Sequence, residues 1–167
     1  MDVRNTSKTS PPAPKRLHRP AWERRLPCEF KILATLSDNS LTINVELEST
    51  DSGVKHRTYA LVDCGTTALF INKDYVRKNE IPTQKLIEAI PVFNVDGTLN
   101  VAGMICEVAE VILQYNDHSE RAVFAVMKPG GYTMILGYTW LCKHNPQIDW
   151  QSKQITMSRC LQHCLTC

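Results

Sequence analysis

The sequence Tyr59-Ala60-Leu61-Val62-Asp63-Cys64-Gly65 delivers a carboxylate from an apolar, strand-like run directly into a glycine turn. A second apolar unit that ends in glycine, Ile135-Leu136-Gly137, follows downstream, and Asp96-Gly97 between the two is a strong signal for a two-residue hairpin. An Asp-x-Gly sequence taken alone is more often an ordinary turn. The order of the three units indicates a carboxylate-bearing loop, a covering hairpin and a second strand that supports the loop.

The rest of the pattern predicts a mostly antiparallel all-β domain, because short alternating segments are separated by frequent turns. A short helix is expected after Asn72, its N-cap, with Ile81-Pro82 as the stop. Trp140 and Trp150 are expected in the core. The predicted strands cover residues 30–36, 41–47, 56–62, 68–71, 85–95, 99–115 with a break near Gly103, 122–127 and 134–137, and a second helix covers 138–144.

The length of 167 residues allows one ordinary domain with tails. Residues 1–26 are rich in proline and carry seven Lys/Arg against two acids, which predicts a disordered basic linker. We expect the folded domain over residues 27–158 and a cysteine-containing tail over residues 159–167. The basic linker is expected to be a solvated tether that makes at most weak contact with nucleic acid through phosphate charge.

Neither a signal peptide nor an apolar run of membrane-spanning length is evident in the sequence. We therefore expect an intracellular, cytoplasmic protein that is not secreted and has no membrane partner.

Seven cysteines are present, and the scattered ones are expected to be reduced core thiols: Cys28, Cys64, Cys106 and Cys142. Three further cysteines close the chain, with His163 among them: Cys160, Cys164 and Cys167. Their spacing lacks a clear fourth ligand, so no metal site and no cofactor are expected. His56, His118 and His144 have no cysteine or serine partner at a recognisable spacing, which argues against a Cys-His hydrolase.

Residues 28–157 resemble a retropepsin, the aspartic peptidase of retroviruses and of Gypsy-class LTR retrotransposons, here of the fungal type. The resemblance rests on the following segments: Asp63-Cys64-Gly65-Thr66-Thr67, Ala68-Leu69-Phe70-Ile71, Asp96-Gly97, the run from Met134 to Leu141, and Asn145-Pro146-Gln147-Ile148-Asp149-Trp150. It implies a retropepsin-like closed barrel, the acid-protease fold, with one or two short helices. Asp149 is expected at the surface.

The resemblance also implies the roles of the site residues. Asp63 would be the catalytic carboxylate, paired with its copy in a symmetric homodimer because one chain supplies one Asp-x-Gly unit. The pair would share one proton, activate a water and hydrolyse peptide bonds of an extended substrate, a retroelement polyprotein. The loop would be supported by Cys64, Gly65, Thr66, Ile135, Leu136 and Gly137, and the flap would bind substrate through Val95, Asp96, Gly97 and Thr98, with Asp96 as turn chemistry only.

Two positions depart from the family pattern. Cys64 stands where Ser or Thr is usual, and a thiol is a weaker hydrogen-bonding group than a hydroxyl. Thr66 stands where Ala is common, and we expect it to crowd the site. A second hypothesis therefore stays open: a catalytically weak or inactive retropepsin-fold module that dimerises or binds peptides, as in a domesticated or decayed transposon fragment. A third is an accessory nucleic-acid role of the basic linker and the terminal cysteines.

Overall fold

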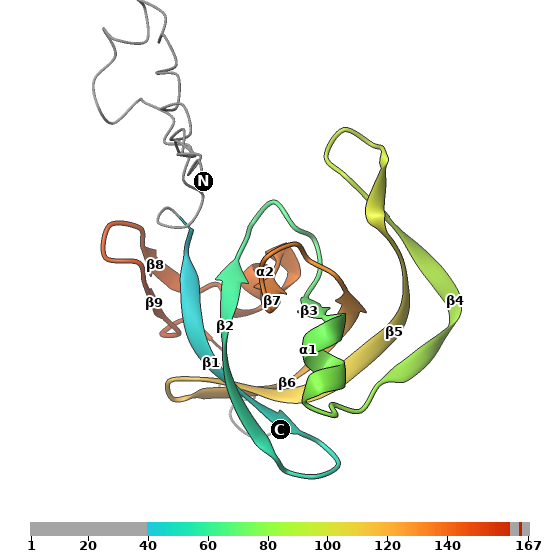
Figure 1. Cartoon of the computed structure of the whole chain (residues 1–167). Helices are drawn as coiled ribbons and strands as arrows, with labels where there is room; N and C mark the ends of the chain where they lie inside the picture. Colours follow the sequence, from blue (N-terminus) through green and yellow to red (C-terminus); the bar gives the residue numbers. More distant parts are fainter. Residues whose placement is uncertain (1–39, 161–163, 165–167) are drawn as a thin grey trace, which may run out of the picture. The chain divides into compact units, whose positions relative to one another are not determined.

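The structure is a computed structural model that describes residues 40–160 and residue 164. The predicted strand over 30–36, the linker over 1–26 and Cys28 lie outside these residues. The described part contains nine strands and two short helices (Figure 1). Their bounds are β1 Thr42–Ser49, β2 Lys55–Val62, β3 Phe70–Asn72, α1 Lys73–Lys78, β4 Gln84–Phe93, β5 Leu99–Tyr115, β6 His118–Met127, β7 Met134–Leu136, α2 Tyr138–His144, β8 Gln147–Asp149 and β9 Gln154–Thr156.

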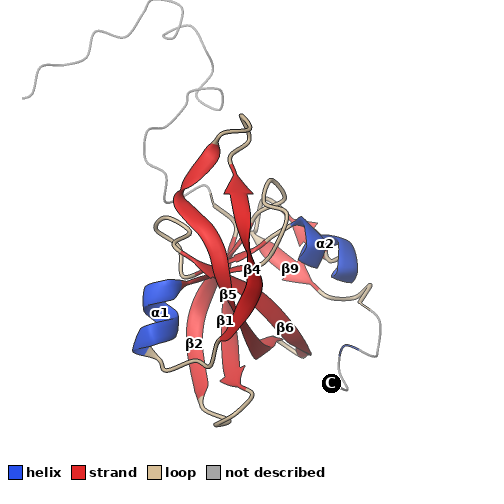
Figure 2. Ribbon diagram, turned by 90° about the vertical axis from the view of Figure 1, so that its right-hand side faces the viewer, coloured by secondary structure: helices blue, strands red, loops and turns tan. Residues whose placement is uncertain are grey.

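Seven of the strands form one sheet in the order β1-β2-β7-β3-β6-β5-β4. An additional antiparallel pairing of β1 with β5 joins the sheet to itself, so six strands make a closed barrel and β4 pairs outside it. Only β2 with β7 and β3 with β6 run parallel. Figures 1 and 2 show the β4–β5 hairpin projecting beyond the barrel. The all-β, mostly antiparallel retropepsin-like fold is confirmed.

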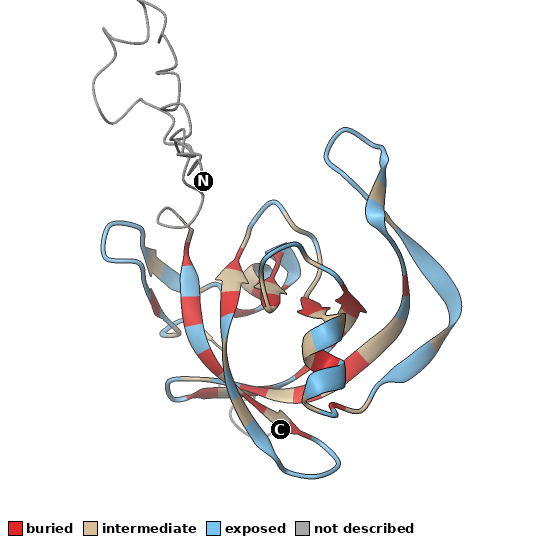
Figure 3. Ribbon diagram, viewed as in Figure 1, coloured by how far each residue is buried: buried red, intermediate tan, exposed pale blue. Residues whose placement is uncertain are grey.

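The barrel interior is filled by alternate residues of its strands. In β1 the side chains of Ile43, Val45 and Leu47 are buried while their neighbours are more exposed, as the period of two requires. They join Phe124 of β6 and Trp140 of α2 in one apolar cluster. Figure 3 shows this burial concentrated in the barrel, whereas the outer part of the β4–β5 hairpin is exposed. The core therefore stabilises the barrel and leaves the hairpin as a projecting arm.

The first helix begins as the sequence predicts. The side-chain oxygen of Asn72 accepts hydrogen bonds from the backbone N–H groups of Asp74 and Tyr75, at 2.8 and 3.2 Å, and satisfies two donors at the helix start. Helix α1 ends at Lys78, three residues before Ile81. Neither helix among the described residues is long and apolar enough to cross a membrane.

Four expectations about side-chain burial are corrected by the structure. Cys64, Cys106 and Cys142 are exposed, not core thiols, because each lies in a loop or on the outer face of its strand or helix. Trp150 is 66% exposed because it follows β8 in a turn, whereas Trp140 is 2% exposed, as predicted.

Gly103 does not end a strand, since β5 runs through it with a left-handed φ of 88°. The β8–β9 hairpin was not predicted. Asp149 is exposed, as expected.

A close crossing places the start of α2 against the loop that follows β2. The backbone N–H groups of Tyr138 and Thr139 donate to the carbonyl oxygens of Thr66 and Thr67, at 2.6 and 3.0 Å. A Cβ on Gly137 would overlap the carbonyl oxygens of Thr66 and Ala68. Only glycine leaves room for this approach of two backbones.

A buried carboxylate lies beside the other end of α2. Glu120 accepts hydrogen bonds from Trp140 Nε1 and Lys143 Nζ, each at 2.7 Å, and its other close partner is His144 Nε2 at 2.9 Å. Burial opposes ionisation, but the hydrogen bonds from His144 and Lys143 outweigh it and lower the pKa of Glu120 to about 2. The charged form of Glu120 thus ties α2 to β6.

Replacing Gly137 by Ala is expected to lower the free energy of unfolding by about 1–3 kcal/mol, because the new methyl group collides with rigid backbone carbonyls. Gly131→Ala is the matched control, since nothing lies within 4 Å of its added Cβ. The control should change stability by less than about 1 kcal/mol. Urea unfolding of the two variants compares them, and equal stabilities would contradict the crossing.

Trp140→Phe is expected to destabilise the protein by about 1.5–3 kcal/mol, because it removes a donor to the buried charge of Glu120. Trp150→Phe alters an exposed ring and should cost less than about 0.5 kcal/mol. Chemical denaturation of both variants measures the difference. A Trp140→Phe variant as stable as the wild type would show that the hydrogen bond to Glu120 is not needed.

Candidate active site

Asp63 lies directly after β2, where the sequence places it. Its backbone N–H donates to the carbonyl oxygen of Leu136 in β7, at 3.0 Å, so the neighbouring parallel strand fixes the position of its Cα. Its side chain is half-buried. Oδ1 accepts a hydrogen bond from the Gly65 N–H at 2.9 Å, and Oδ2 accepts one from Thr66 Oγ1 at 2.6 Å. Both carboxylate oxygens are therefore held by the loop itself.

Thr66 makes a contact that the sequence did not predict, and its crowding of the site stays a prediction. Its hydroxyl faces the carboxylate of Asp63 and donates to it, so the extra atoms orient the acid. Gly65 is more constrained, because a Cβ there would stand 3.2 Å from Asp63 Oδ1. Cys64 is exposed between them. The loop therefore presents one oriented carboxylate and one outward-facing thiol.

The support expected from the second apolar-glycine unit is present. Strand β7 lies between β2 and β3, with Ile135 opposite Leu61 and Leu136 opposite Val62. Leu136 is fully buried, and Ile135 is half-buried against the smaller apolar cluster formed around Phe70. Together with Gly137 at the crossing, these residues form the floor beneath the Asp63 loop.

The residues expected to form a flap lie in the β4–β5 hairpin, which keeps that name below, and its tip differs from the prediction of a two-residue turn. Asn94 and Thr98 form the closing pair, with the Asn94 N–H donating to the Thr98 carbonyl at 2.8 Å, and Val95, Asp96 and Gly97 make a three-residue loop. Gly97 adopts a φ of 81°, the left-handed conformation that such a loop requires at its last position. The added residue shifts the turn but leaves the hairpin in place.

Asp96 has the turn role that the sequence indicates. Its Oδ1 accepts hydrogen bonds from the Thr98 hydroxyl and N–H, at 2.6 and 2.9 Å, and these lower the pKa of Asp96. Asp149 makes a similar turn after β8, and hydrogen bonds from Ser152 and Gln151 lower its pKa. Neither carboxylate lines a hollow beside the Asp63 loop.

A groove of about 940 Å³ lies between the flap and the barrel. It is lined by loop residues 65–68, by the apolar side chains of Phe70, Ile105, Met127 and Ile135, and by both arms of the flap. Asp63 itself lines an adjoining hollow of about 300 Å³ with Trp150 and Lys153. The Asp63 loop thus separates the two hollows, and among their described lining residues Asp63 is the only carboxylate.

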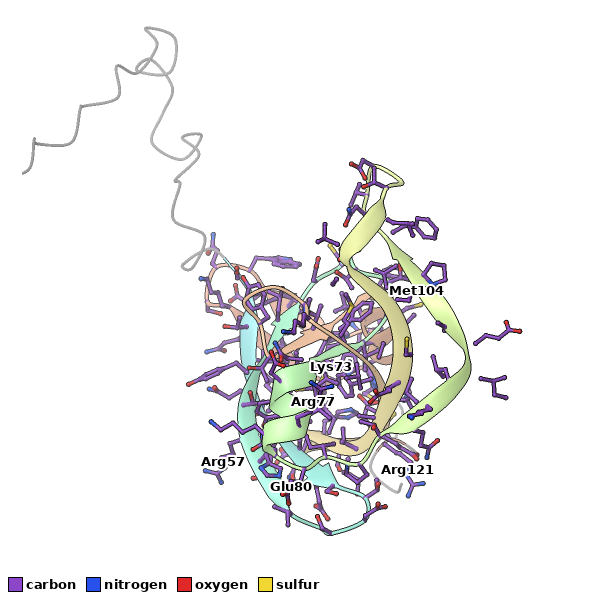
Figure 4. All side chains as sticks on the ribbon, turned by 45° about the vertical axis from the view of Figure 1, so that its right-hand side comes forward. Arg57, Lys73, Arg77, Glu80, Met104 and Arg121 are labelled. Carbon is purple, nitrogen blue, oxygen red and sulfur yellow. The ribbon has the colours of Figure 1, made fainter. Side chains whose placement is uncertain are left out.

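The flap carries large apolar side chains that nothing in the described chain covers. Phe93 is 59% exposed, and Val95 and Val101 are fully exposed. Met104 of β5, labelled in Figure 4, lies on the same projecting arm and is also exposed. Sequence reasoning missed Phe93, Val101 and Met104 as candidate contacts, although apolar residues on both arms of a strongly signalled hairpin could have indicated them. An exposed apolar set of this kind is a candidate binding surface.

Comparison with known proteins gives a family and a set of structural likenesses. The family model described as the PEG10/RTL1 protease domain matches residues 59–164.

The retroviral protease-like domain of Ddi1 from Leishmania major is similar at 16% identity, with 71% of this chain and 88% of that chain covered and a TM-score of 0.45. EIAV protease complexed with the inhibitor HBY-793 shows 13% identity, 70% and 99% coverage and a TM-score of 0.42. Simian Foamy Virus (mac) protease shows 15% identity, 68% and 97% coverage and a TM-score of 0.36.

The matched segment covers well over half of the chain and contains the Asp63 loop, the flap and the β7–α2 support. The chain therefore belongs to the PEG10/RTL1 protease domain family.

Proposed function

We propose that this protein is a homodimeric aspartic endopeptidase in which Asp63 and its symmetry copy form the catalytic dyad. One observation carries the proposal: a single carboxylate, held by hydrogen bonds from Gly65 and Thr66, belongs to the loop whose residues 65–68 line the groove between the barrel and the hairpin flap. Membership of a protease-domain family supports the same reaction class.

The chemistry needs a second carboxylate. One Asp63 takes a proton from a water molecule while the water oxygen attacks the scissile carbonyl carbon. The other Asp63 gives its proton to the carbonyl oxygen. Collapse of the tetrahedral intermediate then breaks the C–N bond as the amide nitrogen gains a proton. Among the described residues that line the two hollows, no other carboxylate could play the second part. A two-fold copy of the chain supplies it.

The flap and groove favour an extended polypeptide as the substrate. Among the described strands β4 pairs only with β5, so one of its edges is available for main-chain hydrogen bonds with an added strand. The apolar lining suits hydrophobic side chains on either side of the cleaved bond. We infer that the substrate is the polyprotein of a retroelement, as the resemblance to Gypsy-class proteases implies.

Cys64 sets the strength of the proposed dimer. By resemblance the side chain at this position hydrogen-bonds across the two-fold axis, and its exposure leaves it available for that contact. A thiol forms weaker hydrogen bonds than a hydroxyl. We infer that the dimer is softer than that of a protease with Ser or Thr here. If it were too weak to assemble, the protein would act as a peptide-binding module instead.

Asp63→Asn is expected to reduce cleavage of an unstructured polypeptide by about 10²- to 10⁴-fold, because the amide can neither take nor give the required proton. Asp149→Asn changes a turn carboxylate that lines neither hollow; it is the matched control and should cleave like the wild type. The assay follows product formation at protein concentrations where sedimentation shows a dimer. Equal cleavage by both variants would exclude the dyad. A dimeric wild type without activity would favour the peptide-binding module.

Cys64→Ser is expected to tighten the dimer by about 10-fold and to raise activity at low protein concentration, because two symmetry-related hydroxyl contacts replace two thiol contacts. Cys106→Ser and Cys142→Ser exchange equally exposed cysteines elsewhere and should change neither quantity. Sedimentation across a dilution series gives the dissociation constants. An unchanged constant for Cys64→Ser would remove this residue from the interface.

A further inference from the structure

A second cluster of chemically active side chains lies at the C-terminal end of α2, away from Asp63. His118 begins β6, His144 ends α2, and Cys160 follows β9. Folding brings one potential ligand atom from each of the three to within 4.8 Å of the others. Cys164 is also buried there, at 3% exposure. Two imidazoles and two thiols therefore converge from three parts of the chain: β6, α2 and the segment after β9.

The distances within the cluster centre on His144. Its Nδ1 lies 3.0 Å from Cys160 Sγ and 3.8 Å from Cys164 Sγ. In a tetrahedral zinc site with ordinary Zn–N and Zn–S bonds, neighbouring ligand atoms stand about 3.3–3.8 Å apart. The two distances from His144 Nδ1 to the sulfur atoms, 3.0 and 3.8 Å, lie just below this range and at its upper end. Small side-chain movements would place the four donors around one ion.

His144 already has the orientation of a metal ligand. Its Nε2 lies 2.9 Å from Glu120 Oε2, and a carboxylate oxygen accepts hydrogen bonds, so Nε2 carries the proton and donates. The lone pair of Nδ1 then faces the two sulfur atoms. A carboxylate that fixes the tautomer of a ligating histidine is the usual second layer of a zinc site. Here that carboxylate is itself held by Trp140 and Lys143.

His118 supplies an independent observation. Its side chain is 3% exposed, and its Nε2 is buried without a hydrogen-bond partner among the described residues. The nearby Glu120 Oε1 is 3.7 Å from it, beyond hydrogen-bond length. An unsatisfied buried imidazole nitrogen is costly. The two thiols lie beside His144 Nδ1, and their contacts there leave His118 Nε2 without a hydrogen-bond partner among the described residues. A metal ion that accepts its lone pair would remove that cost.

We propose that His118, His144, Cys160 and Cys164 form a structural zinc site. Thiolate and imidazole donors favour Zn²⁺ over hard cations, and four protein ligands leave no open position for catalysis. Binding replaces the two thiol protons, which are released to solvent, with two Zn–S bonds. The site clamps the segment around Cys160 and Cys164 to β6 and α2. The sequence did not predict this zinc site because His118 and His144 lie far from Cys160 and Cys164 along the chain.

The test is the metal content and cobalt spectrum of the full 167-residue chain. After gel filtration in metal-free buffer, the wild type should retain about one equivalent of zinc, measured by mass spectrometry of the elements. Substituted with Co²⁺, it should show thiolate-to-cobalt charge transfer and the intense visible bands of tetrahedral cobalt. Cys160→Ser, Cys164→Ser, His118→Asn and His144→Asn should each lose most of the zinc. Glu120→Gln should weaken binding by about 10- to 100-fold.

Control variants distinguish this site from zinc bound elsewhere on the chain. Cys142→Ser and Asp63→Asn should keep the full equivalent, because neither residue belongs to the cluster. His163→Asn and Cys167→Ser should also keep it, and loss of zinc from these two with retention in His118→Asn would overturn the proposal in favour of a site built from the terminal segment alone. Wild type that is folded by circular dichroism yet binds neither zinc nor cobalt would overturn it as well. Folding of every variant is checked in the same way.

Discussion

The crossing at Gly137 is the constraint on which the rest of the site depends. The start of α2 approaches the loop after β2 so closely that its first N–H groups donate to Thr66 and Thr67 carbonyls. Thr66 then serves twice, because its carbonyl holds the helix while its hydroxyl holds the carboxylate of Asp63. A side chain at Gly137 would separate the two elements and release the loop. The acid is thus oriented by backbone packing, before any substrate or second chain is present.

Local patterns were enough to predict much of this arrangement. The apolar run before Asp63, the Asn72 cap and the Ile135-Leu136-Gly137 unit each specify structure through neighbouring residues. Their outcomes match because strand alternation and helix capping act within a few residues. Within the loop, the hydrogen bond from Thr66 and the exposure of Cys64 were not predicted, since the direction of a side chain depends on the loop conformation.

Features that depend on distant contacts could not be predicted in the same way. Asp96-Gly97 marks a turn, but the closing pair of Asn94 and Thr98 determines its length. Cysteines count as apolar in a sequence pattern, yet Cys106 points outward beside the buried Ile105. The histidine and cysteine cluster is the extreme case, since β6, α2 and the segment after β9 meet there only once the barrel has closed.

Helix α2 lies between the loop that contains Asp63 and the histidine and cysteine cluster around His144. It is seven residues, or about 10 Å, long. Its first residue donates to the loop that orients Asp63, and its last, His144, reaches Glu120 and the two cysteines. Such a short helix has little stability of its own, so its position depends on what holds each end. Whatever fixes His144 therefore also limits the movement of the carboxylate-bearing loop, although no side chain of the cluster touches Asp63.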